Sequence, residues 1–266
     1  MVSLREVRKR YGRGPWVLDG IDLDLPAGAL GVLLGANGSG KSTLLRIAAG
    51  ASVPTSGSVA GRPAAVGYVP ERWAGPARMT AAGYLRHMAR LRGAAPSRVD
   101  DLVDRLGPRP GPDVPLGTLS KGNRQKVALA QAFLAPAGLL VLDEPYGGLD
   151  EPAAAELTAL MTESRSAGAT VLVSAHGLDR YAGAGVVREI AAGRLREPVG
   201  GRGMRLAFAP RDGADAAAVA AVAAVEWDER AGWLRVRTDD ADAVLRRALD
   251  AGWSLRHAEQ SWDEPC

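Results

Sequence analysis

Residues 31–42 read GVLLGANGSGKS, a short apolar run followed by a glycine-rich loop that ends in lysine and serine. The apolar run from Gly31 to Leu34 predicts a buried strand, and residues 42–49 predict a helix. The loop between them fits the pattern G-x-x-x-x-G-K-S, in which glycines let backbone N–H groups turn inward around phosphate groups. The stretch therefore predicts an α/β fold with a phosphate-binding loop at the end of a strand.

This loop supplies most of the nucleotide-binding residues that we predict. Lys41 is expected to reach the β- and γ-phosphates of ATP, and the Ser42 hydroxyl is expected to bind Mg²⁺. The helix N-terminus adds a favourable partial charge. The predicted nucleotide-binding residues of the loop are Gly35, Ala36, Asn37, Gly38, Ser39, Gly40, Lys41, Ser42 and Thr43.

A second apolar run ends in two carboxylates. Residues 139–145 read LLVLDEP, which predicts a buried strand whose terminal Asp143 holds Mg²⁺. Glu144 follows directly and is the candidate general base for water. The alternative is an ordinary strand end with solvated carboxylates, and the glycine-rich loop elsewhere in the chain favours the site.

Composition limits the classes of protein that fit. The chain has 266 residues, 47% hydrophobic and 24% charged, enough for one large core plus a small extra domain. Its net charge of +3 is too weak to require nucleic acid as a partner. The only cysteine, Cys266, cannot form an intrachain disulfide. The longest uncharged Ala/Val stretch, residues 216–225, is too short to span a bilayer, so we expect another chain to make any membrane crossing.

The rest of the chain divides into two predicted domains, residues 1–197 and 198–266. The first begins with two strands around a turn between residues 4 and 25, and Val66–Val69 and Val171–Val173 predict further buried strands. Residues 72–135 are expected to be mainly helical, and their last helix is predicted over residues 120–134.

A change to Gly and Arg at residues 197–203 predicts a linker. Beyond it, residues 204–208, 233–237 and 253–255 predict strands. An alanine-rich helix is expected before residue 226, and a second helix is expected over residues 241–249. The pattern is that of a small β-α-β-β-α-β module.

The segment LSKGN, residues 119–123, resembles the signature motif of ATP-binding-cassette proteins, with Ser120 as the N-cap of the helix that follows. The order of motifs also resembles that family over about residues 2–197: the phosphate loop, the signature, the Asp143–Glu144 strand end, Gly-Leu-Asp ending at Asp150, and Ser-Ala-His ending at His176. The resemblance implies a P-loop NTPase cassette with a RecA-like core. It also implies an N-terminal antiparallel β subdomain and a helical signature subdomain, followed here by the small α+β C-terminal module.

The resemblance also implies roles for single residues. Ser120 and Gly122 would close on the γ-phosphate of ATP held by another subunit, and Asp150 would lie at the dimer interface. Tyr11 would stack on adenine. His176 would contact the γ-phosphate and join Glu144 and Lys41 as the catalytic residues.

The chain departs from the family pattern at three positions. Glu71 stands where glutamine is common, and its carboxylate is the third candidate Mg²⁺ ligand. Lys121 and Asn123 stand in the signature where glycine and glutamine are commoner. Both substitutions look like the variant found in drug, polyketide and lantibiotic exporters.

The predicted function is therefore that of the ATP-binding and ATP-hydrolysing subunit of a membrane transporter, with export favoured. A separate transmembrane permease would dock near residues 71–90, at the cytoplasmic face of the cell membrane. The subunit would form a head-to-tail homodimer, or a heterodimer with another ATP-binding subunit, and no nucleic acid partner is expected.

Three alternatives stay open at this point. A soluble cassette ATPase acting on DNA or ribosomes would need a long coiled coil or a second cassette, and the segment between Ser42 and Ser120 holds no long heptad run. A P-loop kinase or nucleotide switch would not need residues 119–122 or 174–176. A subunit that binds ATP without hydrolysing it would not need Glu144 and His176 intact.

Overall fold

The computed structural model describes residues 1–107, 111–178, 180–181, 183–198, 203–210, 226–228, 233–237, 244–246, 248–250 and 252–261. It divides into two compact units, Met1–Glu197 and Pro198–Cys266. Most of the predicted linker and the alanine-rich helix expected before residue 226 lie outside the described residues, as does Cys266.

The first unit starts with a three-stranded antiparallel sheet in the order β2-β1-β4. Strands β1 (Val2–Arg10) and β2 (Trp16–Leu25) flank the turn that the sequence predicts. Strand β4 (Ser56–Ala60) was not predicted, because its residues are almost all exposed and give no apolar pattern.

The central sheet has six strands in the order β5-β6-β7-β3-β8-β9. Five of them are parallel: β3 (Leu30–Leu34), β5 (Val66–Val69), β6 (Leu139–Asp143), β7 (Thr170–Ser174) and β8 (Val186–Ala191). Strand β9 (Arg194–Arg196) pairs antiparallel at the edge. Every residue of β6 and β7 is buried, as expected for parallel strands covered on both faces.

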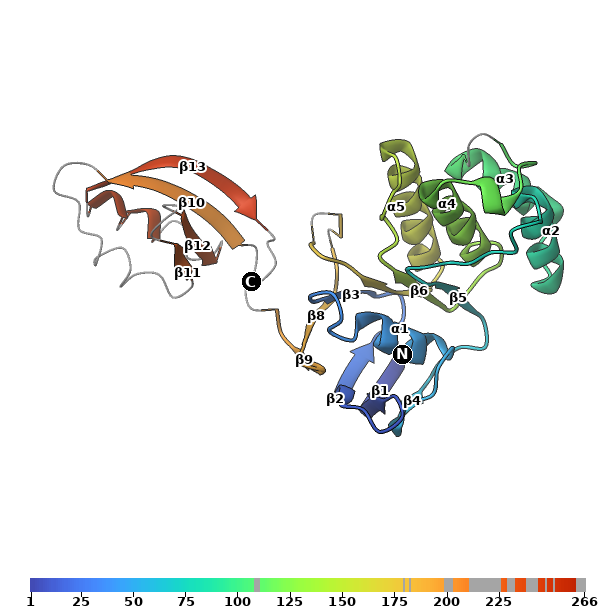
Figure 1. The fold of residues 1–266 in the computed structure, drawn as a ribbon, viewed down its shortest axis with the longest axis horizontal. Helices are drawn as coiled ribbons and strands as arrows, with labels where there is room; N and C mark the ends of the chain where they lie inside the picture. Colours follow the sequence, from blue (N-terminus) through green and yellow to red (C-terminus); the bar gives the residue numbers. More distant parts are fainter. Residues whose placement is uncertain are drawn as a thin grey trace. The chain divides into compact units, whose positions relative to one another are not determined.

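Alternate residues of β6 belong to the two apolar layers that cover this sheet. Leu139 and Val141 pack with helix α1 (Lys41–Ala49) and the N-terminal sheet, whereas Leu140 and Leu142 pack with the helical layer. Figure 1 shows α1 on one side of the central sheet and helices α4 and α5 on the other. This arrangement confirms the predicted cassette, with its antiparallel subdomain and RecA-like core.

Four α-helices and one 3₁₀ turn form the helical layer. They are α2 (Ala81–Leu91), α3 (Pro96–Leu106), η1 (Leu116–Thr118), α4 (Lys121–Ala132) and α5 (Glu151–Ser166). The prediction of a mainly helical region holds from residue 81 onward. Residues 70–80 contain no helix, because Pro70 and Pro76 interrupt the backbone hydrogen-bonding pattern.

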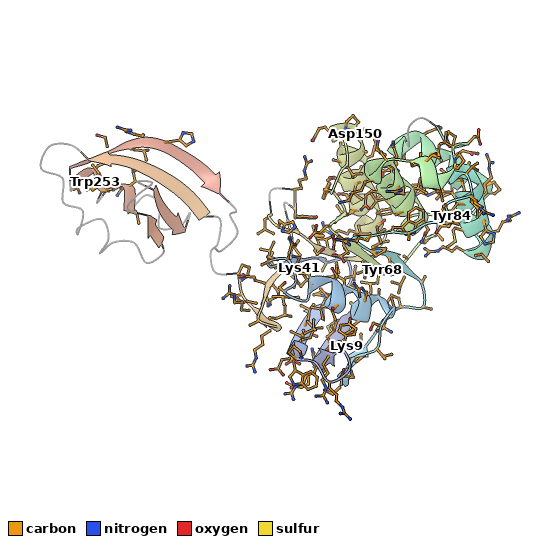
Figure 2. The ribbon with its side chains drawn as sticks, in the orientation of Figure 1. Lys9, Lys41, Tyr68, Tyr84, Asp150 and Trp253 are labelled. Carbon is orange, nitrogen blue, oxygen red and sulfur yellow. The ribbon has the colours of Figure 1, made fainter. Side chains whose placement is uncertain are left out.

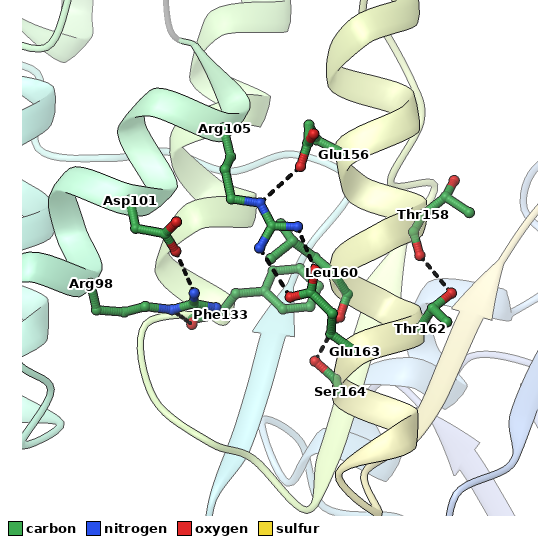
Figure 3. Close-up of polar contacts among 10 residues, drawn as sticks. All are labelled: Arg98, Asp101, Arg105, Phe133, Glu156, Thr158, Leu160, Thr162, Glu163 and Ser164. Carbon is green, nitrogen blue, oxygen red and sulfur yellow. Dashed lines mark hydrogen bonds and ion pairs between the residues drawn. The ribbon is translucent and has the colours of Figure 1, made fainter.

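The side chain of Arg105 links α3 to α5 through hydrogen bonds, as Figure 3 shows. Its Nε donates to Glu156 Oε2 at 2.8 Å, and Nη1 and Nη2 donate to the two carboxylate oxygens of Glu163 at 3.0 and 2.7 Å. Arg98 Nε donates to the carbonyl oxygen of Phe133 at 3.2 Å, at the end of α4. Helix α3 is therefore tied both to α5 and to the helix that follows the signature motif.

The second unit contains an antiparallel sheet in the order β11-β12-β10-β13. Its strands are β10 (Gly203–Pro210), β11 (Glu226–Asp228), β12 (Trp233–Arg237) and β13 (Trp253–Ser261). Residues 244–246 and 248–250 are helical, and the side chains of Val244, Ala248 and Trp253 are buried. The three predicted strands and the second predicted helix are therefore present.

Among the residues that the structure describes, none of the helices combines the length and apolarity needed to cross a membrane.

Candidate nucleotide-binding site

The glycine-rich loop runs from the end of β3 to the start of α1 in a conformation that two of its glycines require. Gly35 has φ +141°, and a Cβ there would lie 2.5 Å from the carbonyl oxygen of Ile190. Gly40 has φ +111°, and a Cβ there would lie 2.9 Å from the carbonyl oxygen of Val17. A side chain at Gly35 would clash with strand β8, and one at Gly40 would clash with strand β2. The loop therefore packs closely against both strands.

Lys41 is the first residue of α1, and its side chain turns back over the loop. It is only 5% exposed, and Figure 2 labels its place within the first unit. Its Nζ donates hydrogen bonds to the carbonyl oxygens of Gly35 and Ala36, the second at 3.2 Å. The ammonium is therefore already fixed at the mouth of the loop, where phosphate oxygens could replace the carbonyl oxygens as acceptors.

Two further features of the loop fit a phosphate group. The hydroxyl oxygen of Ser39 is buried and has no hydrogen-bond partner within the described residues. Gly40 occupies the N-cap position of α1 and provides no side-chain cap, and the first turn of the helix carries no acidic residue. A bound anion would accept hydrogen bonds from the buried hydroxyl and from the backbone N–H groups at the uncapped helix N-terminus.

Asp143 lies at the carboxyl end of β6 and is 1% exposed. Its Oδ1 accepts a hydrogen bond from the Ser174 hydroxyl at 2.6 Å, and Ser174 Oγ in turn accepts from the Glu144 backbone N–H at 2.8 Å. The two strands place Asp143 directly opposite Ser174. Ser174 therefore orients the predicted metal ligand and fixes the start of the next segment. Sequence reasoning named it only as part of a motif.

Glu144 has φ +48°, a left-handed conformation that costs a non-glycine residue about 1–3 kcal/mol. Its Oε1 lies 2.9 Å from Nε2 of His176. Both side chains line a cleft of about 250 Å³, together with Tyr146, Arg180 and Tyr181. The structure therefore brings two of the three predicted catalytic side chains, Glu144 and His176, into contact at one cleft.

Tyr68 on β5 was not predicted as a site residue. Its hydroxyl is buried without a hydrogen-bond partner among the described residues. Burial raises the pKa of this phenol, and the negative charge of Asp143 raises it further, whereas Arg46 lowers it. The phenol therefore stays protonated at neutral pH, close to the predicted metal ligand.

The signature residues make close contacts within their own chain. Ser120 caps α4 by accepting a hydrogen bond from the Asn123 N–H at 3.3 Å. A Cβ on Gly122 would lie 2.2 Å from the carbonyl oxygen of Gly148. The N-terminus of α4 therefore touches the segment that leads to Asp150.

Asp150 caps α5 through Oδ1, which accepts from the Ala153 N–H at 3.2 Å. Its Oδ2 pairs with Nζ of Lys126, a residue of α4, at 2.8 Å. Figure 2 labels Asp150 at the top of the helical layer and Lys41 near the middle of the unit. The structure therefore does not bring Asp150 to the phosphate loop of the same chain.

Tyr11 and Glu71 stand apart from the other predicted residues. Tyr11 is 52% exposed in the turn after β1, and Nζ of Lys9 lies 5.2 Å from its ring centroid. Glu71 is exposed, two residues after β5. Within the described part of the chain, no hydrogen bond or ion pair links either residue to Lys41 or Asp143.

Comparison with known proteins adds independent evidence. A family model described as ABC transporter matches residues 18–147. The zinc import ATP-binding protein ZnuC of Paramagnetospirillum magneticum is 37% identical over 181 residues, covering 67% of this chain and 68% of ZnuC. The macrolide export ATP-binding/permease protein MacB of Nitrosomonas europaea is 34% identical over 219 residues, covering 73% of this chain and 33% of MacB.

Solved structures agree in fold. An ATP-binding subunit of an ABC transporter aligns with a TM-score of 0.66 at 26% identity, covering 73% of this chain and 88% of that chain. A dimeric cassette in a post-hydrolysis state, bound to ADP and Pi, aligns with a TM-score of 0.67 at 22% identity, covering 74% and 97%. The second likeness, at this identity, concerns the fold alone.

Proposed function

The chain belongs to the ABC transporter family and is an ATPase of that family, and we propose that it powers a membrane exporter by ATP-driven closure of two subunits. The observation that most supports the hydrolytic step of this proposal is the cleft where Glu144 meets His176, beside the hydrogen bond between Asp143 and Ser174. A protein that only binds nucleotide would not need a strained carboxylate next to a histidine at the end of this strand.

Each predicted residue has a separate role in phosphoryl transfer from ATP to water. Lys41 and the N–H groups of the loop bind the phosphates, and His176 holds the γ-phosphate in place. Glu144 accepts the proton of the attacking water. Catalysis then depends on positioning and on charge stabilisation.

Mg²⁺ is the metal that we propose for this site. The Ser42 hydroxyl and the Asp143 carboxylate would hold it, with Glu71 as the third candidate ligand. Mg²⁺ prefers oxygen ligands and is often bound by one or two carboxylates together with substrate phosphates. When bound, it neutralises charge on the β- and γ-phosphates.

The second half of the site is proposed to come from another subunit. Ser120 and Gly122 lie at the start of α4, next to the segment that carries Asp150, and Figure 2 labels Asp150 in the helical layer, apart from Lys41. A head-to-tail pair would bring these groups of one subunit to the ATP of the other. A homodimer and a heterodimer both fit this geometry.

A separate permease is proposed to dock on residues 71–90, which places the subunit at the cytoplasmic face of the cell membrane. Trp73 anchors this loop by packing on Tyr84, with ring centroids 5.2 Å apart. Leu91, at the end of α2, is 68% exposed. The ring contact holds the loop that carries Trp73 against α2, and an anchored loop offers a partner a fixed surface.

Export is the proposed direction of transport. The relatives include an importer and an exporter, so they support neither direction alone. Lys121 and Asn123 in the signature resemble the drug, polyketide and lantibiotic exporters and favour export.

The test uses tagged Glu144→Gln protein in its native host, because this variant should hold ATP without hydrolysing it. The protein is purified from detergent-solubilised membranes with ATP present, and Lys41→Ala serves as the control that cannot bind ATP. A multi-span membrane protein in near-equal amount, recovered with Glu144→Gln, is the expected result. Recovery of ribosomes or nucleic acid, or of the subunit alone, would overturn the transporter assignment and leave the ATPase.

A further inference from the structure

Arg180 lies on the edge of the cleft that holds Glu144 and His176. Its Nη2 donates to Glu151 Oε2 at 2.9 Å and its Nη1 donates to Glu151 Oε1 at 3.3 Å. Its guanidinium also lies over the ring of Tyr146, 5.4 Å from the centroid. None of these contacts has a role in the mechanism proposed above.

The contacts join two segments that both carry site residues. Arg180 follows His176 by four positions, and Glu151 is the first residue of α5, directly after Asp150. A second contact reinforces the first, because the rings of Tyr146 and Tyr181 meet edge to face with centroids 5.5 Å apart.

The segment between Glu144 and Asp150 is in turn fixed on α5. The hydroxyl groups of Tyr146 and Thr158 are hydrogen-bonded at 2.7 Å. Tyr181 is almost fully buried, so burial raises the pKa of its phenol and keeps it neutral. Arg180 therefore links the segment that follows His176 to the start of α5, directly after Asp150, at the edge of the cleft.

We propose that Arg180 is a positioning residue whose ion pair with Glu151 makes His176 follow the Asp150 segment when two subunits close. This inference rests on the proposed function, because it assigns Arg180 to the same hydrolytic site. Asp150 lies at the expected interface, so closure moves its segment, and the ion pair passes that movement to His176. His176 then reaches the γ-phosphate only in the closed pair.

The geometry favours this role over direct contact with ATP. Both terminal nitrogens of Arg180 are engaged by one carboxylate, which leaves the guanidinium facing α5. The Arg180 hydrogen bonds also lower the pKa of the Glu151 carboxyl, so the pair is ionised at neutral pH.

The pair is exposed, which sets the size of the expected effect. Its side chains are 46% and 78% exposed for Arg180 and Glu151. Exposed ion pairs are weak and are screened by salt. We therefore expect loss of the pair to lower kcat by about three- to fivefold rather than to abolish turnover.

The experiment is a charge swap in the full-length protein. Steady-state ATPase rates and unfolding temperatures are measured for Arg180→Glu, Glu151→Arg and the double variant. Each single variant should lower kcat by about three- to fivefold with the KM for ATP unchanged within about twofold, and the double variant should regain kcat to within about twofold. Arg180→Gln, which removes the guanidinium without adding a negative charge, replaces Arg180→Glu if that variant does not fold.

The matched control is Arg5→Glu, which reverses one charge of the pair Arg5–Asp24. That pair is 2.7 Å long and its side chains are 49% and 52% exposed, but it lies in the N-terminal sheet. Its kcat should match that of the unaltered chain.

Three outcomes would overturn the inference. They are single variants with unchanged kcat, a double variant that stays as slow as the singles, and a raised KM for ATP that would place Arg180 in contact with the nucleotide. If the unaltered chain hydrolyses no ATP, the proposed function fails instead, so the two failures are distinguishable.

Discussion

Gly122→Ala tests whether the signature helix and the segment before Asp150 depend on each other for position. The new methyl group would lie 2.2 Å from the carbonyl oxygen of Gly148, about 1.2 Å closer than ordinary van der Waals contact. Both partners are backbone, so neither can move aside by changing a rotamer. The N-terminus of α4 must therefore shift away from residues 147–149.

The change in the free energy of unfolding caused by Gly122→Ala is the sum of two opposing effects. Overpacking in a tight contact costs about 1–3 kcal/mol, whereas alanine in place of glycine in a helix returns up to about 1 kcal/mol. The net loss is about 1–2 kcal/mol, which corresponds to a fall of about 2–8 °C in the unfolding temperature of the first unit. The shift also displaces Ser120, so we expect kcat to fall more than about tenfold.

The assay is thermal unfolding without nucleotide, followed by steady-state ATPase measurement. Gly185→Ala is the control, because a Cβ there meets nothing within 4 Å and its backbone is not left-handed. That control should keep or slightly raise the unfolding temperature. An unchanged unfolding temperature for Gly122→Ala would show that this glycine serves only the approach to ATP and would refute the packing argument.

The remaining predictions concern binding and stability. Lys41→Ala should abolish ATP binding measured by calorimetry, because it removes the ammonium fixed at the loop; binding at the unaltered affinity would contradict the site. Arg105→Gln should lower the free energy of unfolding in urea by about 1.5–3 kcal/mol, because its charge-assisted hydrogen bonds join α3 to α5; a loss below about 0.5 kcal/mol would show that these hydrogen bonds contribute nothing. The Arg105 hydrogen bonds lower the pKa of Glu163 below its ordinary value of 4.5, so this carboxylate stabilises the fold above that value and the stabilisation is lost as pH falls through the folded-state pKa. The stability difference between the unaltered chain and Glu163→Gln should therefore shrink as the pH falls below about 4.5; a difference that stays constant would contradict the pairing.

Much of the cassette could be predicted from the sequence because its central strands are short, fully apolar runs. The strands Leu139–Asp143 and Thr170–Ser174 are buried on both faces, so their composition alone marks them. The loop before α1 could be predicted because its glycines and lysine occupy fixed positions.

Other parts of the fold and of the site are marked only weakly in the sequence. Strand β4 and the edge strand β9 are largely exposed, so no apolar pattern marks them. Ser174 and Arg180 act through contacts across 31 and 29 residues of sequence, with Asp143 and Glu151 respectively, and only the folded chain shows such pairs. The place of Ser174 at the carboxyl end of an apolar run is the one signal that could have found it.

The most direct test of the central claim is the behaviour of purified Glu144→Gln with Mg-ATP. The account predicts that this variant binds ATP, loses turnover and forms a stable dimer by light scattering, whereas Lys41→Ala stays a monomer under the same conditions. Undiminished ATP hydrolysis by Glu144→Gln would contradict the assignment of Glu144 as the base and, with it, the proposed mechanism.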